Sequence, residues 1–172
     1  LVVADVSGSM YGMPMAVSIS LAMYIAERNT SPVWKDKFLT FSAQPELQTI
    51  VGSTIGKRID NLFRASWHTN TDLMAVFKTV LSAAEKNNVR AEEMPQKLII
   101  VSDMQFDQCT RYDDSAMEMI ARKYSEAGYN VPNIVFWNLN ASDNVPVKFN
   151  EKGVALVSGF SPSIVKGILA AD

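Results

Sequence analysis

The sequence has one cysteine, Cys109, and no long apolar run. A single thiol cannot form an internal disulfide or a zinc site built from several thiolates. No apolar stretch approaches the roughly 18 residues that a membrane-spanning helix needs, and no basic and apolar secretion signal opens the chain. Together with nine methionines, these absences favour a reducing setting. We therefore expect a cytoplasmic protein without a membrane partner.

An excess of positive charge is also missing. The chain has 16 Lys and Arg against 18 Asp and Glu, a formal net charge of -2. A broad nucleic-acid surface needs a clustered excess of Lys and Arg, so we do not expect this segment to supply the main contacts to RNA. The length of 172 residues suits one domain. Because the chain begins at Leu1 and directly with a strand, we expect residues 1–172 to be a single domain of a longer protein.

Short apolar segments alternate along the chain with segments of helical periodicity. Strands are predicted at Leu1–Ala4, Lys37–Ser42, Leu47–Val51, Lys97–Ser102, Ile134–Asn138 and Val154–Val157. Helices are predicted at Pro14–Arg28, Ile55–Arg64, Asp72–Asn87 and Asp114–Ala127, with a closing helix from Ser161 to Leu169. This order predicts an α/β fold with a doubly wound, mainly parallel six-stranded sheet and helices on both faces. The short gap containing Pro45 predicts a hairpin, which makes Leu47–Val51 an antiparallel edge strand.

Polar side chains follow the first of these strands. Asp5, Ser7 and Ser9 alternate along a loop that Gly8 allows to turn tightly, so their side chains can converge on one point. Two further residues, Thr71 before a predicted helix and Asp103 after a predicted strand, can join them, because ligand sites of such sheets lie at the carboxyl ends of strands.

This set contains two carboxylates and three hydroxyls and no nitrogen or sulfur ligand. An all-oxygen set suits a hard cation, Mg²⁺ or Mn²⁺. Neutral hydroxyls would leave such an ion electrophilic enough to attract a carboxylate from outside. The sequence therefore predicts a divalent-metal site formed by Asp5, Ser7, Ser9, Thr71 and Asp103.

The segment DVSGSM, Asp5–Met10, resembles the metal-ion-dependent adhesion site (MIDAS) of von Willebrand factor A-type (vWA) domains, with its D-x-S-x-S pattern and distant Thr and Asp. Thr71 and Asp103 match the distant pair, and the expected order of strands and helices matches that fold along the chain. DVSGSMYGMPM and VSDMQFD look most similar to intracellular A domains, including that of the Ro ribonucleoprotein autoantigen and related uncharacterised proteins. The resemblance implies a Rossmann-like binding module, not an enzyme, in which the metal recognises an acidic residue of a protein partner.

Two positions depart from the family pattern. Met104 stands where many relatives have glycine after the last acid, and Trp67-His68-Thr69-Asn70 replaces the usual paired glycines before Thr71. Thr69 therefore competes with Thr71 as the hydroxyl ligand, although the position at the helix entry favours Thr71. We expect Asp72 to cap that helix and not to bind the metal.

Two other functions compete with metal-dependent binding. A haloacid-dehalogenase-type phosphatase also begins with an Asp after its first strand, but it needs a second acid two residues later, where this chain has Ser7. Metal-assisted hydrolysis is thus the weaker hypothesis. The alternative is a domain of a Ro-like ribonucleoprotein, in which regions before Leu1 would bind RNA. Of the methionines near the loop, some are expected to pack under the first helix, and Met10 with Tyr11 could instead form an apolar rim for a partner.

Overall fold

The computed structural model describes residues 1–5, 8–42, 44–64, 72–103, 114–139 and 154–159, and the structure below is that of these residues. Its strands are β1 (Val2–Ala4), β2 (Lys37–Thr40), β3 (Leu47–Thr49), β4 (Lys97–Ser102), β5 (Asn133–Asn138) and β6 (Val154–Ser158). Its helices are α1 (Met13–Arg28), α2 (Ile55–Phe63), α3 (Leu73–Lys86) and α5 (Asp114–Glu126), with short 3-10 turns η1 (Gly8–Met10) and η2 (Ala91–Glu93).

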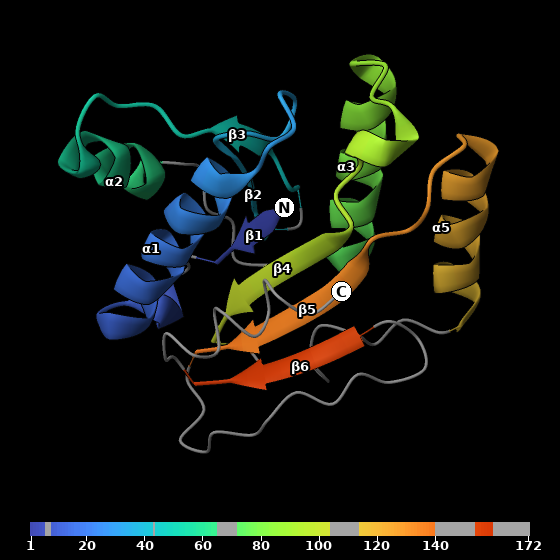
Figure 1. The fold of residues 1–172 in the computed structure, drawn as a ribbon. Helices are drawn as coiled ribbons and strands as arrows, with labels where there is room; N and C mark the ends of the chain where they lie inside the picture. Colours follow the sequence, from blue (N-terminus) through green and yellow to red (C-terminus); the bar gives the residue numbers. More distant parts are fainter. Residues whose placement is uncertain (6–7, 43, 65–71, 104–113, 140–153, 160–172) are drawn as a thin grey trace.

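The six strands form one sheet in the order β3-β2-β1-β4-β5-β6, with helices on both faces (Figure 1). All neighbouring strands are parallel except β2 and β3, which form an antiparallel pair. The predicted fold class and the predicted antiparallel edge strand are therefore confirmed. None of the helices in the described ranges is long and apolar enough to cross a membrane.

Alternation along the strands divides the core into two clusters. On one face, Val2 and Ala4 pack with α1 and with Leu62 of α2. On the other face, Leu1 and Val3 pack with the apolar sides of α3 and α5. The central strands β1 and β4 are thus buried on both faces, which explains why their sequences are continuous apolar runs.

Most predicted boundaries lie within two residues of the observed ones, and Lys97–Ser102 is identical to β4. The apolar face of α3 is buried along its whole length. Tyr24 of α1 is 39% exposed and lies under the guanidinium of Arg28. The amphiphilic tyrosine ring is stable there because a cation stacks on it. The closing helix expected from Ser161 lies outside the described residues.

Tyr124 of α5 ties the two helices of one face together. Its ring is fully buried and meets Phe77 of α3 edge to face, with ring centroids 6.2 Å apart. Its hydroxyl donates a hydrogen bond of 2.8 Å to the backbone carbonyl of Phe77. Burial raises the pKa of the Tyr124 hydroxyl above its usual value, because the phenolate would be desolvated there.

Replacing Tyr124 by phenylalanine should change how stability depends on alkaline pH. The unfolded chain loses the tyrosine proton near pH 10, whereas the folded chain retains it, so the stabilisation by Tyr124 is complete below pH 10 and declines above it. We expect Tyr124→Phe to cost about 0.5–1.5 kcal/mol at neutral pH, through the lost hydrogen bond. Urea unfolding at a series of pH values should show this difference shrinking above pH 10.

The exposed Tyr11 provides the control for this measurement. Tyr11→Phe should leave both the free energy of unfolding and its pH dependence as in the unmodified chain. A difference between Tyr124→Phe and the unmodified chain that stays constant through alkaline pH would contradict the assignment.

Candidate metal site

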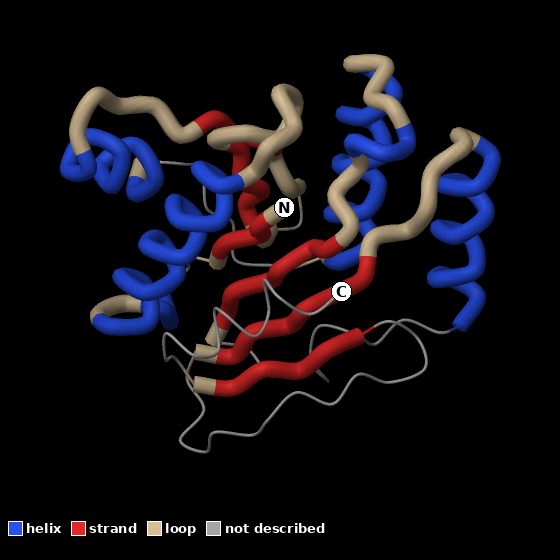
Figure 2. The backbone as a smooth tube through the Cα atoms, viewed as in Figure 1, coloured by secondary structure: helices blue, strands red, loops and turns tan. Residues whose placement is uncertain are grey.

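Asp5 and Asp103 follow two neighbouring parallel strands, β1 and β4, at the same edge of the sheet (Figure 2). Ala4 pairs with Val101 in the register of these strands, so the next residues, Asp5 and Ser102, stand side by side. The two predicted acidic ligands therefore come to adjacent strand ends, although they are far apart in the sequence.

The side chain of Asp5 is only 2% exposed, and serines of two other elements hold this residue. Its Oδ2 accepts a hydrogen bond of 2.7 Å from Ser102 Oγ, and its backbone carbonyl accepts one of 2.9 Å from Ser18 Oγ of α1. Its amide donates to the carbonyl of Val101, 2.9 Å away, which continues the β1–β4 ladder. The carboxylate is thus fixed in orientation at the end of the central strand.

Ser102 and Ser18 were missed as site residues by sequence reasoning. Both are fully buried hydroxyls in otherwise apolar segments, KLIIVS and the buried side of α1. A buried serine in such a segment needs a hydrogen-bond partner, and that was the signal available in the sequence. The sequence alone could not predict that Asp5 is the partner of Ser102, because the two residues are 97 positions apart.

Asp103 is partly buried, and its two carboxylate oxygens differ in surroundings. Oδ1 is inaccessible to solvent and has no hydrogen-bond partner among the described residues. Buried polar atoms in native proteins are almost always paired, with protein groups, ordered water or ions. This unpaired oxygen at the end of β4 therefore fits a residue that faces a hydrated cation.

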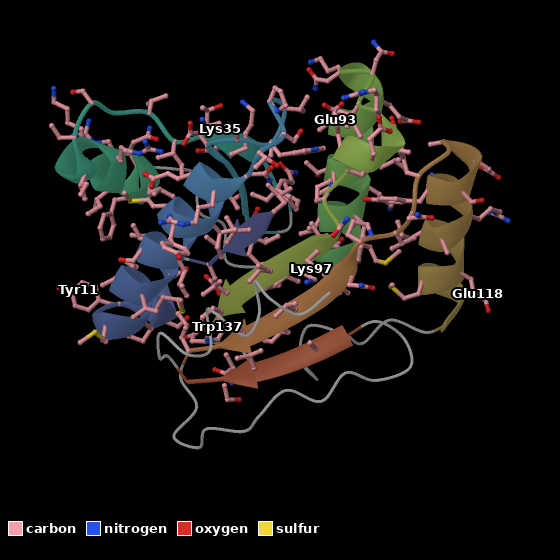
Figure 3. The ribbon with its side chains drawn as sticks, in the orientation of Figure 1. Tyr11, Lys35, Glu93, Lys97, Glu118 and Trp137 are labelled. Atoms are coloured by element: carbon pink, nitrogen blue, oxygen red, sulfur yellow. The ribbon has the colours of Figure 1, made fainter. Side chains whose placement is uncertain are left out.

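The loop after β1 forms the 3-10 turn η1, which contains Ser9, before α1 begins at Met13. Ser9 is exposed at this edge. Met10 is fully buried in the core beneath α1, so it is among the methionines that pack under the first helix, and the alternative of an apolar rim does not hold for it. Tyr11 is 87% exposed and lies at the N-terminal end of α1 (Figure 3), where Met13 is 64% exposed. Tyr11 and Met13, and not Met10, are therefore the exposed apolar side chains beside this loop.

Asp72 caps α3, as expected. Its side chain accepts a hydrogen bond of 3.1 Å from the amide of Ala75, and its own amide donates to the carbonyl of Ser42, 3.4 Å away. The start of α3 thus lies against the end of β2.

Several predicted residues lie outside the described ranges: Ser7, Thr71 and its competitor Thr69, together with Trp67, His68, Met104 and Cys109. Their assignments stay predictions. In the described part of the chain, no three His, Cys, Asp or Glu side chains gather as a metal cluster. The predicted site has only two carboxylates and completes its ligands with hydroxyls.

A family model described as "Domain of unknown function (DUF7788)" matches residues 1–172, and the chain belongs to this family. The uncharacterized protein L728 of Acanthamoeba polyphaga mimivirus is 36% identical over 99% of the chain. The chain spans only 30% of the length of that curated relative.

Two solved structures share the fold at low sequence identity. The Ro (RSR) protein of Deinococcus radiodurans is 15% identical, with a TM-score of 0.60 over 98% of this chain and 33% of its own. The VWA domain of SpRpn10 is 12% identical, with a TM-score of 0.51 over 98% of this chain and 91% of its own. The chain therefore has the fold of a vWA domain.

Replacing Ser102 by alanine should destabilise the folded chain, because it removes a donor from a buried carboxylate. Hydrogen bonds to charged groups contribute about 1.5–3 kcal/mol, and we expect a loss of this size in urea unfolding of Ser102→Ala. The matched control is Ser20→Ala, which removes an exposed hydroxyl that bonds only to its own helix at Ala16. If both variants lose the same small amount, the Asp5–Ser102 bond does not hold the site.

Proposed function

We propose that this member of the DUF7788 family is a metal-dependent binding module that recognises an acidic residue of a protein partner. In this proposal Asp5, Ser7, Ser9, Thr71 and Asp103 hold Mg²⁺ or Mn²⁺. Bound there, the cation would supply a Lewis-acidic position for a carboxylate from outside. The vWA fold of the chain and the D-x-S-x-S pattern of its first loop support the proposal.

The unpaired Oδ1 of Asp103 is the observation that carries it. This oxygen is buried just after β4, and Asp5, which is also buried, follows the neighbouring strand β1. Two carboxylates at adjacent strand ends repel one another, and a divalent cation near both converts that repulsion into attraction. The residues present therefore suit a hard cation.

The chain's other groups have separate roles in the proposal. Ser102 orients the Asp5 carboxylate through its 2.7 Å hydrogen bond, and Ser18 fixes the backbone of Asp5 against α1. The exposed side chains of Tyr11 and Met13 offer apolar contact to whatever brings the acidic residue. Ser7, in the position where a phosphatase of the haloacid-dehalogenase type has its second acid, supports binding over hydrolysis.

A second candidate function is that of a domain in a larger ribonucleoprotein. The fold similarity to the Ro protein, at a TM-score of 0.60, favours it, and so does the greater length of the mimivirus relative. In this case the formal charge of -2 argues that RNA would be bound mainly by other parts of the protein.

A mobility-shift titration of this chain with structured RNA should then show weak binding that salt abolishes, and tight binding would reverse this assignment.

The metal is tested by titrating the chain with Mn²⁺ and Mg²⁺ in a calorimeter and following the melting temperature in parallel. We expect binding by the unmodified chain, and a loss of at least about tenfold in affinity for Asp103→Asn, which keeps the size of the side chain and removes its charge. Asp5→Ala should remove binding altogether. Ligand binding to the folded state alone should also raise the melting temperature of the unmodified chain.

Glu126→Gln is the matched control for charge, because Glu126 is an exposed carboxylate at the end of α5, where the chain turns toward the start of β5. It should bind Mn²⁺ as the unmodified chain does. The proposal fails if neither cation produces heat or a change in melting temperature in the unmodified chain.

A further inference from the structure

A second unpaired polar atom lies near the predicted site, on a residue outside the predicted ligand set. Ser42 follows β2, the strand that pairs with β1 on the side opposite to β4. The residue is fully buried, and its Oγ has no hydrogen-bond partner among the described residues. A hydroxyl in that state lowers the stability of the folded chain, because its bonds to water are lost and not replaced.

Ser42 and Asp103 follow the two strands that flank β1, and both strands run parallel to it. Ala4 in the central strand pairs with Thr40 on one side and with Val101 on the other. Ser42 and Asp103 come two residues after these partners, in the segments that follow β2 and β4 on either side of β1. The two unpaired buried atoms, Ser42 Oγ and Asp103 Oδ1, thus belong to residues that flank the strand carrying Asp5.

Ser42 also lies next to the start of α3. Its carbonyl accepts the hydrogen bond from the amide of Asp72, the cap residue of that helix. Asp72 is covalently joined to Thr71, the predicted hydroxyl ligand. Ser42 therefore links the end of β2, which pairs with β1, to the cap residue of α3.

We propose that Ser42 is a further positioning residue of this site, whose hydroxyl holds a water molecule of the hydrated cation. This inference rests on the proposed metal-binding function. Mg²⁺ and Mn²⁺ keep several waters when proteins bind them, and polar groups around the first ligands orient those waters. The position explains why a buried hydroxyl is present at a point where alanine would pack without an unpaired group.

The test is the affinity of Ser42→Ala for Mn²⁺, measured by electron paramagnetic resonance of the free ion and by calorimetry. We expect an affinity about tenfold weaker than that of the unmodified chain, the usual size of the effect for a residue around the first ligands. The melting temperature of the metal-free variant should be equal or higher, because an unpaired hydroxyl has been removed. A purely structural serine would instead lower the melting temperature and leave metal affinity unchanged.

Ser31 provides a matched control. Its Oγ is also buried without a hydrogen-bond partner among the described residues, but it lies in the turn before β2, at the opposite edge of the sheet. Ser31→Ala makes the same chemical change and should leave Mn²⁺ affinity as in the unmodified chain. Ser42→Cys, which keeps nearly the size of serine, should weaken Mn²⁺ binding too, and it decides the question if Ser42→Ala does not fold.

The possible failures are distinguishable. If the unmodified chain does not bind Mn²⁺, the proposed function and this inference fall together. If the unmodified chain binds Mn²⁺ and Asp103→Asn does not, but Ser42→Ala and Ser42→Cys bind as the unmodified chain does, only the role of Ser42 is wrong. Equal losses in Ser42→Ala and Ser31→Ala would also overturn that role.

Discussion

The burial of the Asp5 carboxylate at the end of the central strand is the constraint on which the candidate site depends. A carboxylate that is 2% exposed destabilises the fold unless its surroundings offer hydrogen-bond donors or positive charge. Ser102 of the neighbouring strand supplies one donor, and Ser18 of α1 fixes the backbone at the same point. The pairing of β1 with β4 and the packing of α1 are therefore both tied to the position of one side chain.

The topology explains why polar groups gather at this point. The chain leaves β1 to form α1 on one face of the sheet, whereas the helix between β4 and β5, α5, packs on the other face. The connections from two adjacent strands thus diverge, and ligand crevices of open α/β sheets lie at such points. The apolar clusters on both faces stabilise the sheet independently of its edge, so unpaired groups such as Asp103 Oδ1 can be tolerated there.

The fold could be predicted because its signals are local. The run KLIIVS predicts a buried parallel strand, and Asp72 before an apolar helical stretch predicts a cap, and both are as expected. The bond from Ser102 to Asp5 joins residues 97 positions apart, so only the register of two strands reveals it. The choice between the two positions open to Met10, the core and the rim, was likewise not local, because the 3-10 turn η1 places this residue in the core and leaves Tyr11 exposed, which no helical or strand period predicts.

Fold similarity below 25% identity does not decide what the chain binds, because one fold carries many functions. The hydrogen bonding of the buried polar atoms at the site says more about what it binds. If these residues only stabilised the fold, we would expect Ser42 Oγ and Asp103 Oδ1 to have hydrogen-bond partners in the protein, or apolar residues to stand in their place. Either arrangement would make the folded state more stable. Asp5, in contrast, is paired, with Ser102, and so is available in one fixed orientation. Asp5 thus lies between two segments that each carry a buried oxygen atom without a hydrogen-bond partner among the described residues, Ser42 Oγ and Asp103 Oδ1. A hydrated divalent cation suits such a set of oxygens, because it offers both positive charge and bound water.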